Sequence, residues 1–113
     1  MRLIIKATNI DLSDALETYI NQKIGGLDKF LKDFDPELVQ ARVEIGKPSR
    51  HHKSGFVYYA EVNLSLPGKL LRAESNHLDL RYAVNEAKNE LEKQIEKYKN
   101  KLEAQRLKSK TSI

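Results

Sequence analysis

Histidine and carboxylate side chains are the first candidates for chemistry, because the chain contains no cysteine. His51 and His52 are adjacent, but they stand between Arg50 and Lys53 and have no carboxylate near them in the sequence. A metal ion would be repelled there, and contacts to phosphate are the better use for such a loop. Neither a phosphate-binding glycine loop nor a nucleophile motif occurs in the chain. We therefore expect no enzyme activity, no metal or cofactor, and no small-molecule substrate.

Basic residues are the more informative set of charged side chains. The 113-residue chain has 20 Lys and Arg against 16 Asp and Glu, a formal net charge of +4 and an isoelectric point near 9.3. Residues 97–110 alone contain six basic residues and one acid, a net charge of +5. Acids elsewhere near the C-terminus alternate with lysines at three- and four-residue steps, as ion pairs on a helix surface do. The basic excess points to a polyanionic partner such as nucleic acid, although many soluble proteins are equally basic.

Helical periodicity arranges these cations into columns. At about 100° per residue, the expected C-terminal helix carries one column of cations on each flank of its apolar stripe. The candidate RNA-binding residues are Lys23 and Lys29 on the first helix, Lys93, Lys97 and Lys101 in one column of the last helix, and Arg81, Lys88 and Lys99 in the other. Two parallel helices with facing cations would form a groove for a phosphate backbone, with Lys93 and Lys97 across it from Lys23 and Lys29. A charge run on one helix, however, is usually a solvated face.

Hydrophobic periodicity predicts the elements that position these side chains. In chain order we expect a strand at 2–7, a helix at about 15–33 weakened by Gly25-Gly26, strands at 38–46, 56–66 and 70–75, and a helix at about 78–105. The Pro67-Gly68 turn predicts a hairpin between the last two strands. Residues 1–105 should form one domain, and 106–113 a basic, disordered tail.

This order, β-α-β-β-β-α, predicts an α+β two-layer sandwich. Clean alternation means that one face of the four-stranded sheet is buried, so both helices should cover that face. One core is expected from Leu3, Ile5, Leu16, Ile24, Leu27, Val43, Val62, Leu64, Leu71, Ala73, Leu91 and Ile95. Solvent should reach Arg42, Glu44, Tyr59, Glu61, Asn63 and Arg72. The N-terminal apolar run is too short for a signal peptide and no stretch could span a membrane, so we expect a soluble, cytoplasmic protein.

Several local patterns run through nearly the whole chain, from Met1 to about Lys101. They lie at 5–16 (IKATNIDLSDAL), 19–20, 23–24, 27–30, 60–64, 67–68, 71–74 and 79–101. In order and spacing they resemble the ribosome hibernation-promoting / ribosome-associated inhibitor family in its short form. The resemblance implies a fold similar to double-stranded-RNA-binding domains.

The resemblance also implies a function. The expected partner is the small ribosomal subunit with its rRNA, bound in the decoding region so that mRNA and tRNA are blocked sterically and translation stops. No membrane takes part, and the chain should be monomeric away from the ribosome. The RNA-facing cations of the family match Lys23, Lys29, Lys93 and Lys97, whereas Gly26 and Glu90 stand where lysines are usual.

Two other functions fit the same residues. A general double-stranded-RNA-binding module would have the same fold and the same basic surface. A protein-interaction adaptor would instead use the open sheet face, around Ile4, Tyr59 and Leu70. The first would bind free duplex RNA as well as ribosomes, and the second would bind its partner with little dependence on salt.

Overall fold

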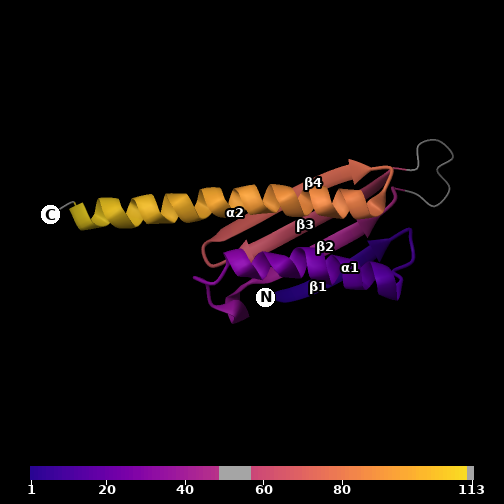
Figure 1. Ribbon diagram of the computed structural model, residues 1–113, viewed down its shortest axis with the longest axis horizontal. Helices are drawn as coiled ribbons and strands as arrows, with labels where there is room; N and C mark the ends of the chain where they lie inside the picture. The colour runs from indigo at the N-terminus through magenta and orange to yellow at the C-terminus, as the bar shows by residue number, and fades with distance from the viewer. Residues whose placement is uncertain (49–56, 112–113) are drawn as a thin grey trace.

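The computed structural model describes residues 1–48 and 57–111 and has the predicted order of main elements (Figure 1). The strands are β1 (Arg2–Thr8), β2 (Gln40–Gly46), β3 (Tyr58–Leu66) and β4 (Lys69–His77). The helices are α1 (Asp14–Gly25) and α2 (Leu80–Thr111), with short 3-10 helices η1 (Gly26–Phe30) and η2 (Pro36–Leu38) between α1 and β2.

The four strands form one sheet in the order β1-β2-β3-β4. β1 and β2 are parallel and are connected through α1, while β2, β3 and β4 form the expected antiparallel meander. Figure 1 shows both helices on the same face of this sheet, running in the same direction. The predicted α+β sandwich with two helices on one face is therefore confirmed.

A single apolar core lies between the sheet and the helices. Buried residues alternate along β2, β3 and β4, because every second side chain of a strand points to the same face. Ten of the twelve expected core residues are at most 8% exposed. The other two, Leu3 and Ile5, are half-buried against the core because β1 is an edge strand. Each fully buried side chain, such as Leu91, contributes roughly 1.5–3 kcal/mol to the stability.

The first helix is shorter than its hydrophobic periodicity predicts. Ser13 caps its N-terminus by accepting a hydrogen bond from the backbone N–H of Leu16 (3.1 Å). The α-helix then ends at Gly25 and continues as η1, so the expected single helix to residue 33 is wrong. Two successive glycines make the α-helix costly at this point, and the tighter 3-10 turn still buries Leu27.

The last helix is longer than expected. It continues to Thr111, although the sequence suggested an end near Gln105 and a disordered tail from 106. Residues 106–111 are therefore helical, and 112–113 lie outside the described residues. Asp79 caps the start of α2, because its Oδ1 accepts from the backbone N–H of Arg81 (2.9 Å).

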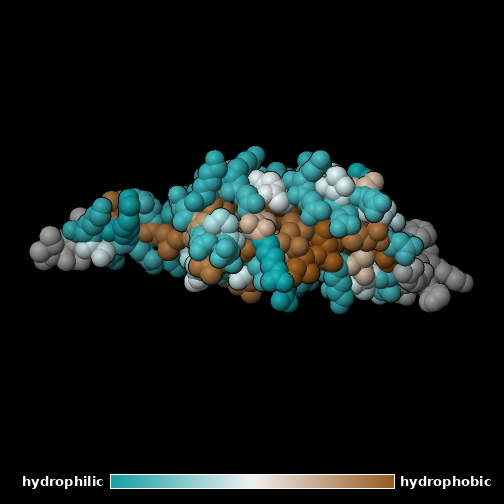
Figure 2. Space-filling model, turned by 90° about the horizontal axis from the view of Figure 1, so that it is seen from below, coloured by the Kyte–Doolittle hydropathy of each residue, from teal (hydrophilic) through white to brown (hydrophobic). Residues whose placement is uncertain are grey.

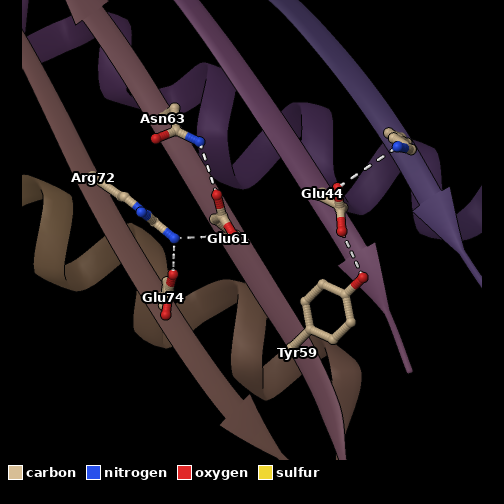
Figure 3. A network of polar contacts seen from close by, with 7 residues as sticks. Glu44, Tyr59, Glu61, Asn63, Arg72 and Glu74 are labelled. Carbon is tan, nitrogen blue, oxygen red and sulfur yellow. Dashed lines mark hydrogen bonds and ion pairs between the residues drawn. The ribbon is translucent and has the colours of Figure 1, made fainter. Parts of the chain in front are cut away.

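The open face of the sheet carries a polar network, shown in Figure 3. It consists of the ion pairs Lys6–Glu44, Arg72–Glu61 and Arg72–Glu74, and of hydrogen bonds donated by Tyr59 to Glu44 (2.6 Å) and by Asn63 to Glu61 (3.1 Å). Arg42 and Arg72 are exposed, as expected. The remaining four residues of the expected set are half-buried, because their side chains lie against one another.

One residue of this network has a shifted acidity. Burial raises the pKa of Tyr59 above its ordinary value, and the hydrogen bond to Glu44 and the charges of Glu44 and Glu61 raise it further. The neutral phenol is thus favoured in the folded protein. As the pH rises past about 10, Tyr59 ionises first in the unfolded chain. The stability that the neutral phenol contributes is then lost progressively, until the pH exceeds the higher pKa of the folded state.

Gly46 ends β2 and pairs with Thr8 of β1. A Cβ at Gly46 would overlap the carbonyl oxygen of Thr8, which is fixed by a hydrogen bond from the N–H of Lys47 (3.1 Å). The variant Gly46→Ala should therefore lose about 2–3 kcal/mol of unfolding free energy, measured by urea denaturation.

A matched glycine provides the control for that measurement. Nothing lies within 4 Å of a Cβ built on Gly25, and its backbone is already right-handed helical. Gly25→Ala should therefore stabilise the protein by about 0.5–1 kcal/mol. A Gly46→Ala protein as stable as the parent would contradict the close β1–β2 approach.

The acidity of Tyr59 gives a prediction about alkaline stability. The parent should lose unfolding free energy between pH 9 and 11 more steeply than Tyr59→Phe, because the variant has no phenol to ionise. Urea midpoints at several pH values measure the difference. Tyr82→Phe, which removes the hydroxyl from a half-exposed ring, serves as the control and should follow the parent.

Candidate nucleic-acid interface

The two parallel helices are joined at both ends of their shared seam. The hydroxyl of Tyr19 on α1 donates to the carbonyl of Arg81 at the start of α2 (3.0 Å). Further along α2, Lys99 donates to the carbonyl of Phe30 (3.0 Å) and lies 3.7 Å from a carboxylate oxygen of Asp33. These contacts fix which flank of α2 faces α1.

Three of the candidate cations lie on this inner flank of α2. The guanidinium of Arg81 lies 5.0 Å from the centroid of the Tyr19 ring. Lys88 forms an ion pair with Glu92 (2.8 Å), and Lys99 makes the two contacts to the η1 region described above. We call Arg81, Lys88 and Lys99 the inner column; the charges of Lys88 and Lys99 are paired within the protein, and that of Arg81 lies over the Tyr19 ring.

The other three candidate cations of α2 lie on its opposite flank. Lys93 lines a hollow together with Arg72, Glu74 and other residues of β4 and α2, so this flank faces β4 rather than α1. Lys97 and Lys101 follow at four-residue steps on the same side. All three are exposed, and none has an ion-pair partner among the described residues. We call Lys93, Lys97 and Lys101 the outer column.

The cations expected on the first helix lie near aromatic rings. Lys23 is half-buried, with its Nζ 5.7 Å from the centroid of Tyr19. Lys29 is exposed on η1, with its Nζ 5.1 Å from the centroid of Phe30. Contacts of this kind hold a charge over a ring face while leaving it open to solvent.

The structure therefore separates the eight candidate cations into different surfaces, and they do not line the single groove that was expected between the helices. Lys93 and Lys97 do not lie across a groove from Lys23 and Lys29, because the flank of α2 that faces α1 is the one with Arg81. In the helical layer, the inner column makes contacts within the protein near the seam between α1 and α2. The outer column is exposed on the far flank of α2.

Sequence reasoning missed the aromatic partners at the seam. Tyr19 stands four residues before Lys23, and Phe30 directly follows Lys29. The four-residue step from Tyr19 to Lys23 brings ring and cation together on a helix, so that contact could have been predicted. Adjacent side chains of a helix do not face each other, so the contact between Lys29 and Phe30 could not. The His51-His52 loop, considered for phosphate contacts, lies outside the described residues.

No group of three or more His, Cys, Asp and Glu side chains is arranged to hold a metal ion within residues 1–48 and 57–111. Over the same ranges, no helix has both the length and the apolar character needed to cross a membrane.

Curated proteins similar to this chain include ribosome hibernation promotion factors. The chain is 30% identical over 100 residues to the ribosome hibernation promotion factor of Lactococcus lactis subsp. cremoris, which covers 87% of this chain and 49% of that protein. It is 29% identical over 102 residues to the factor of the same name from Staphylococcus aureus, covering 90% and 50%. The chain thus spans about half the length of the curated relatives it matches.

Solved structures share the fold. The N-terminal domain of Thermus thermophilus Protein Y aligns with a TM-score of 0.70 and 27% identity, covering 87% of this chain and 99% of that domain. A ribosomal subunit interface protein from Coxiella burnetii aligns with a TM-score of 0.64 at 21% identity, covering 88% and 99%. The second likeness concerns the fold alone.

A family model describes most of the chain. Residues 3–103 match the model for the Sigma 54 modulation protein / S30EA ribosomal protein family. This match and the named relatives confirm the resemblance to ribosome hibernation-promoting factors noted from the sequence. The chain belongs to the Sigma 54 modulation protein / S30EA ribosomal protein family.

Proposed function

We propose that this chain binds the decoding region of the small ribosomal subunit in the cytoplasm and stops translation by occupying the space of mRNA and tRNA. The observation that carries the proposal is the outer column. In a chain of this family, three exposed lysines on one helix flank have no ion-pair partner among the described residues. Such a row suits the regularly spaced phosphates of rRNA.

The proposed mechanism needs no catalytic group. A rigid two-layer domain excludes other molecules from the volume it fills, and phosphate contacts hold it there. The inner column contributes by keeping the helices at a fixed spacing, because Arg81 and Lys99 bind groups of α1, η1 and the turn that follows. Lys23 and Lys29 add charge at the α1 side of the same layer.

The two competing functions fit the structure less well. The open sheet face, which an adaptor would use, has most of its charges joined to one another in the network of Figure 3. A partner that binds there would have to break these pairs and remove water from their charges, which costs free energy. The network offers the partner no unpaired charge in return. A general duplex-RNA module shares the basic helical layer, so only a binding experiment separates it from a ribosome-specific factor.

Sedimentation with purified small subunits tests the proposed target. We expect binding to small subunits to be tighter than binding to a free RNA duplex by roughly tenfold or more, because a specific site adds contacts to the charge interaction. Filling the subunit with mRNA and tRNA beforehand should prevent binding. Equal affinity for duplex and subunit would favour the general RNA module, and unchanged binding to filled subunits would exclude occupancy of the decoding region.

The outer column gives a prediction about salt dependence. Each neutralised phosphate releases counterions, so Lys93→Gln with Lys97→Gln should reduce the slope of log affinity against log salt by about 1.5. The fold should persist, because exposed substitutions usually change stability by less than about 0.5 kcal/mol. The control is Arg2→Gln with Arg42→Gln, the same charge change on the open sheet face, which should leave the slope unchanged. The reverse pattern would place the RNA on the sheet.

A further inference from the structure

The end of α2 projects beyond the rest of the protein. A helix of 32 residues is about 48 Å long, whereas the longest strands have nine residues and span about 30 Å. Figure 1 shows the last turns of α2 clear of the sheet. The last half-buried residues are Tyr98 and Lys99, and every residue from 100 to 110 is exposed. We call residues 101–111 the arm.

The arm extends the outer column. It contains Lys101, Arg106, Lys108 and Lys110 against one acid, Glu103. At about 100° per residue, Lys108 lies on the same side of the helix as the outer column, within roughly 60° of its members. Arg106 and Lys110 lie on the opposite side, roughly 140° and 180° away from Lys101. One line of lysines thus runs from Lys93 to Lys108, over about 22 Å of helix.

The arm lacks the features of a helix that docks on protein. Its two leucines, Leu102 and Leu107, are 37% and 52% exposed and lie about 140° apart around the helix, so they form no apolar stripe. A partner helix or an apolar groove would need such a stripe. Charge is the property that the arm offers continuously, which selects a polyanion as the occupant.

The arm also has a physical reason to need that partner. An unpacked helical segment of this length is marginal in water. At its base, Lys101 lies four residues after Lys97, and these two charges repel one another. Phosphates placed along the outer column would replace this repulsion with attraction. Binding would then stabilise the helix and hold the RNA strand in the same step.

We propose that the arm binds the phosphate backbone of RNA through Lys101 and Lys108, extending the contact of the helical layer beyond the domain. This inference rests on the proposed function, since it assigns a further part of the same RNA surface. It makes the contact directional. The side of the arm with Lys101 and Lys108 binds, and the opposite side, where Arg106 pairs with Glu103 (2.8 Å), does not.

Two charge-matched double variants test the direction of the contact. Lys101→Gln with Lys108→Gln removes two positive charges from the proposed side, and Arg106→Gln with Lys110→Gln removes two from the other. With purified small subunits, the first pair should reduce the salt slope by about 1.5, and the second by less than about 0.5. Equal losses would show diffuse attraction to a basic segment, and no loss in either would show that the arm makes no contact; both results overturn the proposal.

A third variant tests whether the arm must be helical. Ala104→Pro keeps every charge but breaks α2 after the domain, since proline removes a backbone donor and clashes with the preceding turn. Its affinity should fall about as far as that of the Lys101/Lys108 pair. Parental affinity would contradict an ordered arm. The Lys93/Lys97 variant in the same assay keeps the two hypotheses apart: if it weakens binding while the arm variants do not, the proposed function stands and the arm fails.

Discussion

Both helices bury their apolar stripes against one face of a single sheet, and this one-sided burial decides which charges remain for a partner. The helices must lie side by side, so one flank of each is consumed by the seam between them. On α2 that flank carries Arg81 and Lys99, which hold Tyr19 and the η1 region. Among the residues that the structure describes, the lysines on the other flank have no such partners. The surface available for binding is therefore the flank of α2 that does not pack against α1, and the packing of the core determines where it lies.

The main elements could be predicted because alternation and helical spacing report directly on burial. Val62 and Leu91 were assigned to the core from spacing alone, and both are fully buried. The ends of the helices were predicted less well, since packing does not determine them. At Gly25 two glycines favour a tighter turn over a longer α-helix. Beyond Tyr98 no proline or glycine stops α2, and a segment without an apolar stripe was taken for disorder although its residues still form a helix.

The candidate site shows a different limit of sequence reasoning. Helical periodicity gives the angle between two residues of one helix, so the two columns of α2 were separated correctly. Periodicity does not say which column faces the neighbouring helix, because that depends on how α2 lies on β3 and β4. The expected groove paired Lys93 with the first helix, whereas contacts to β4 residues place it on the far side. Only the tertiary structure shows which column faces α1. It places the inner column there, whereas the outer column was expected there from the sequence.

The distribution of charge along α2 connects the domain to its arm. The resemblance predicts a lysine at position 90, but Glu90 stands there and accepts a hydrogen bond from Gln94 (3.3 Å). Its negative charge lies one turn before Lys93 and weakens the field at the start of the outer column. The positive charge is instead concentrated from Lys97 onward, where the helix leaves the sheet. A phosphate strand following the gradient of potential would be drawn toward the end of α2, so Glu90 and the basic arm act in the same direction.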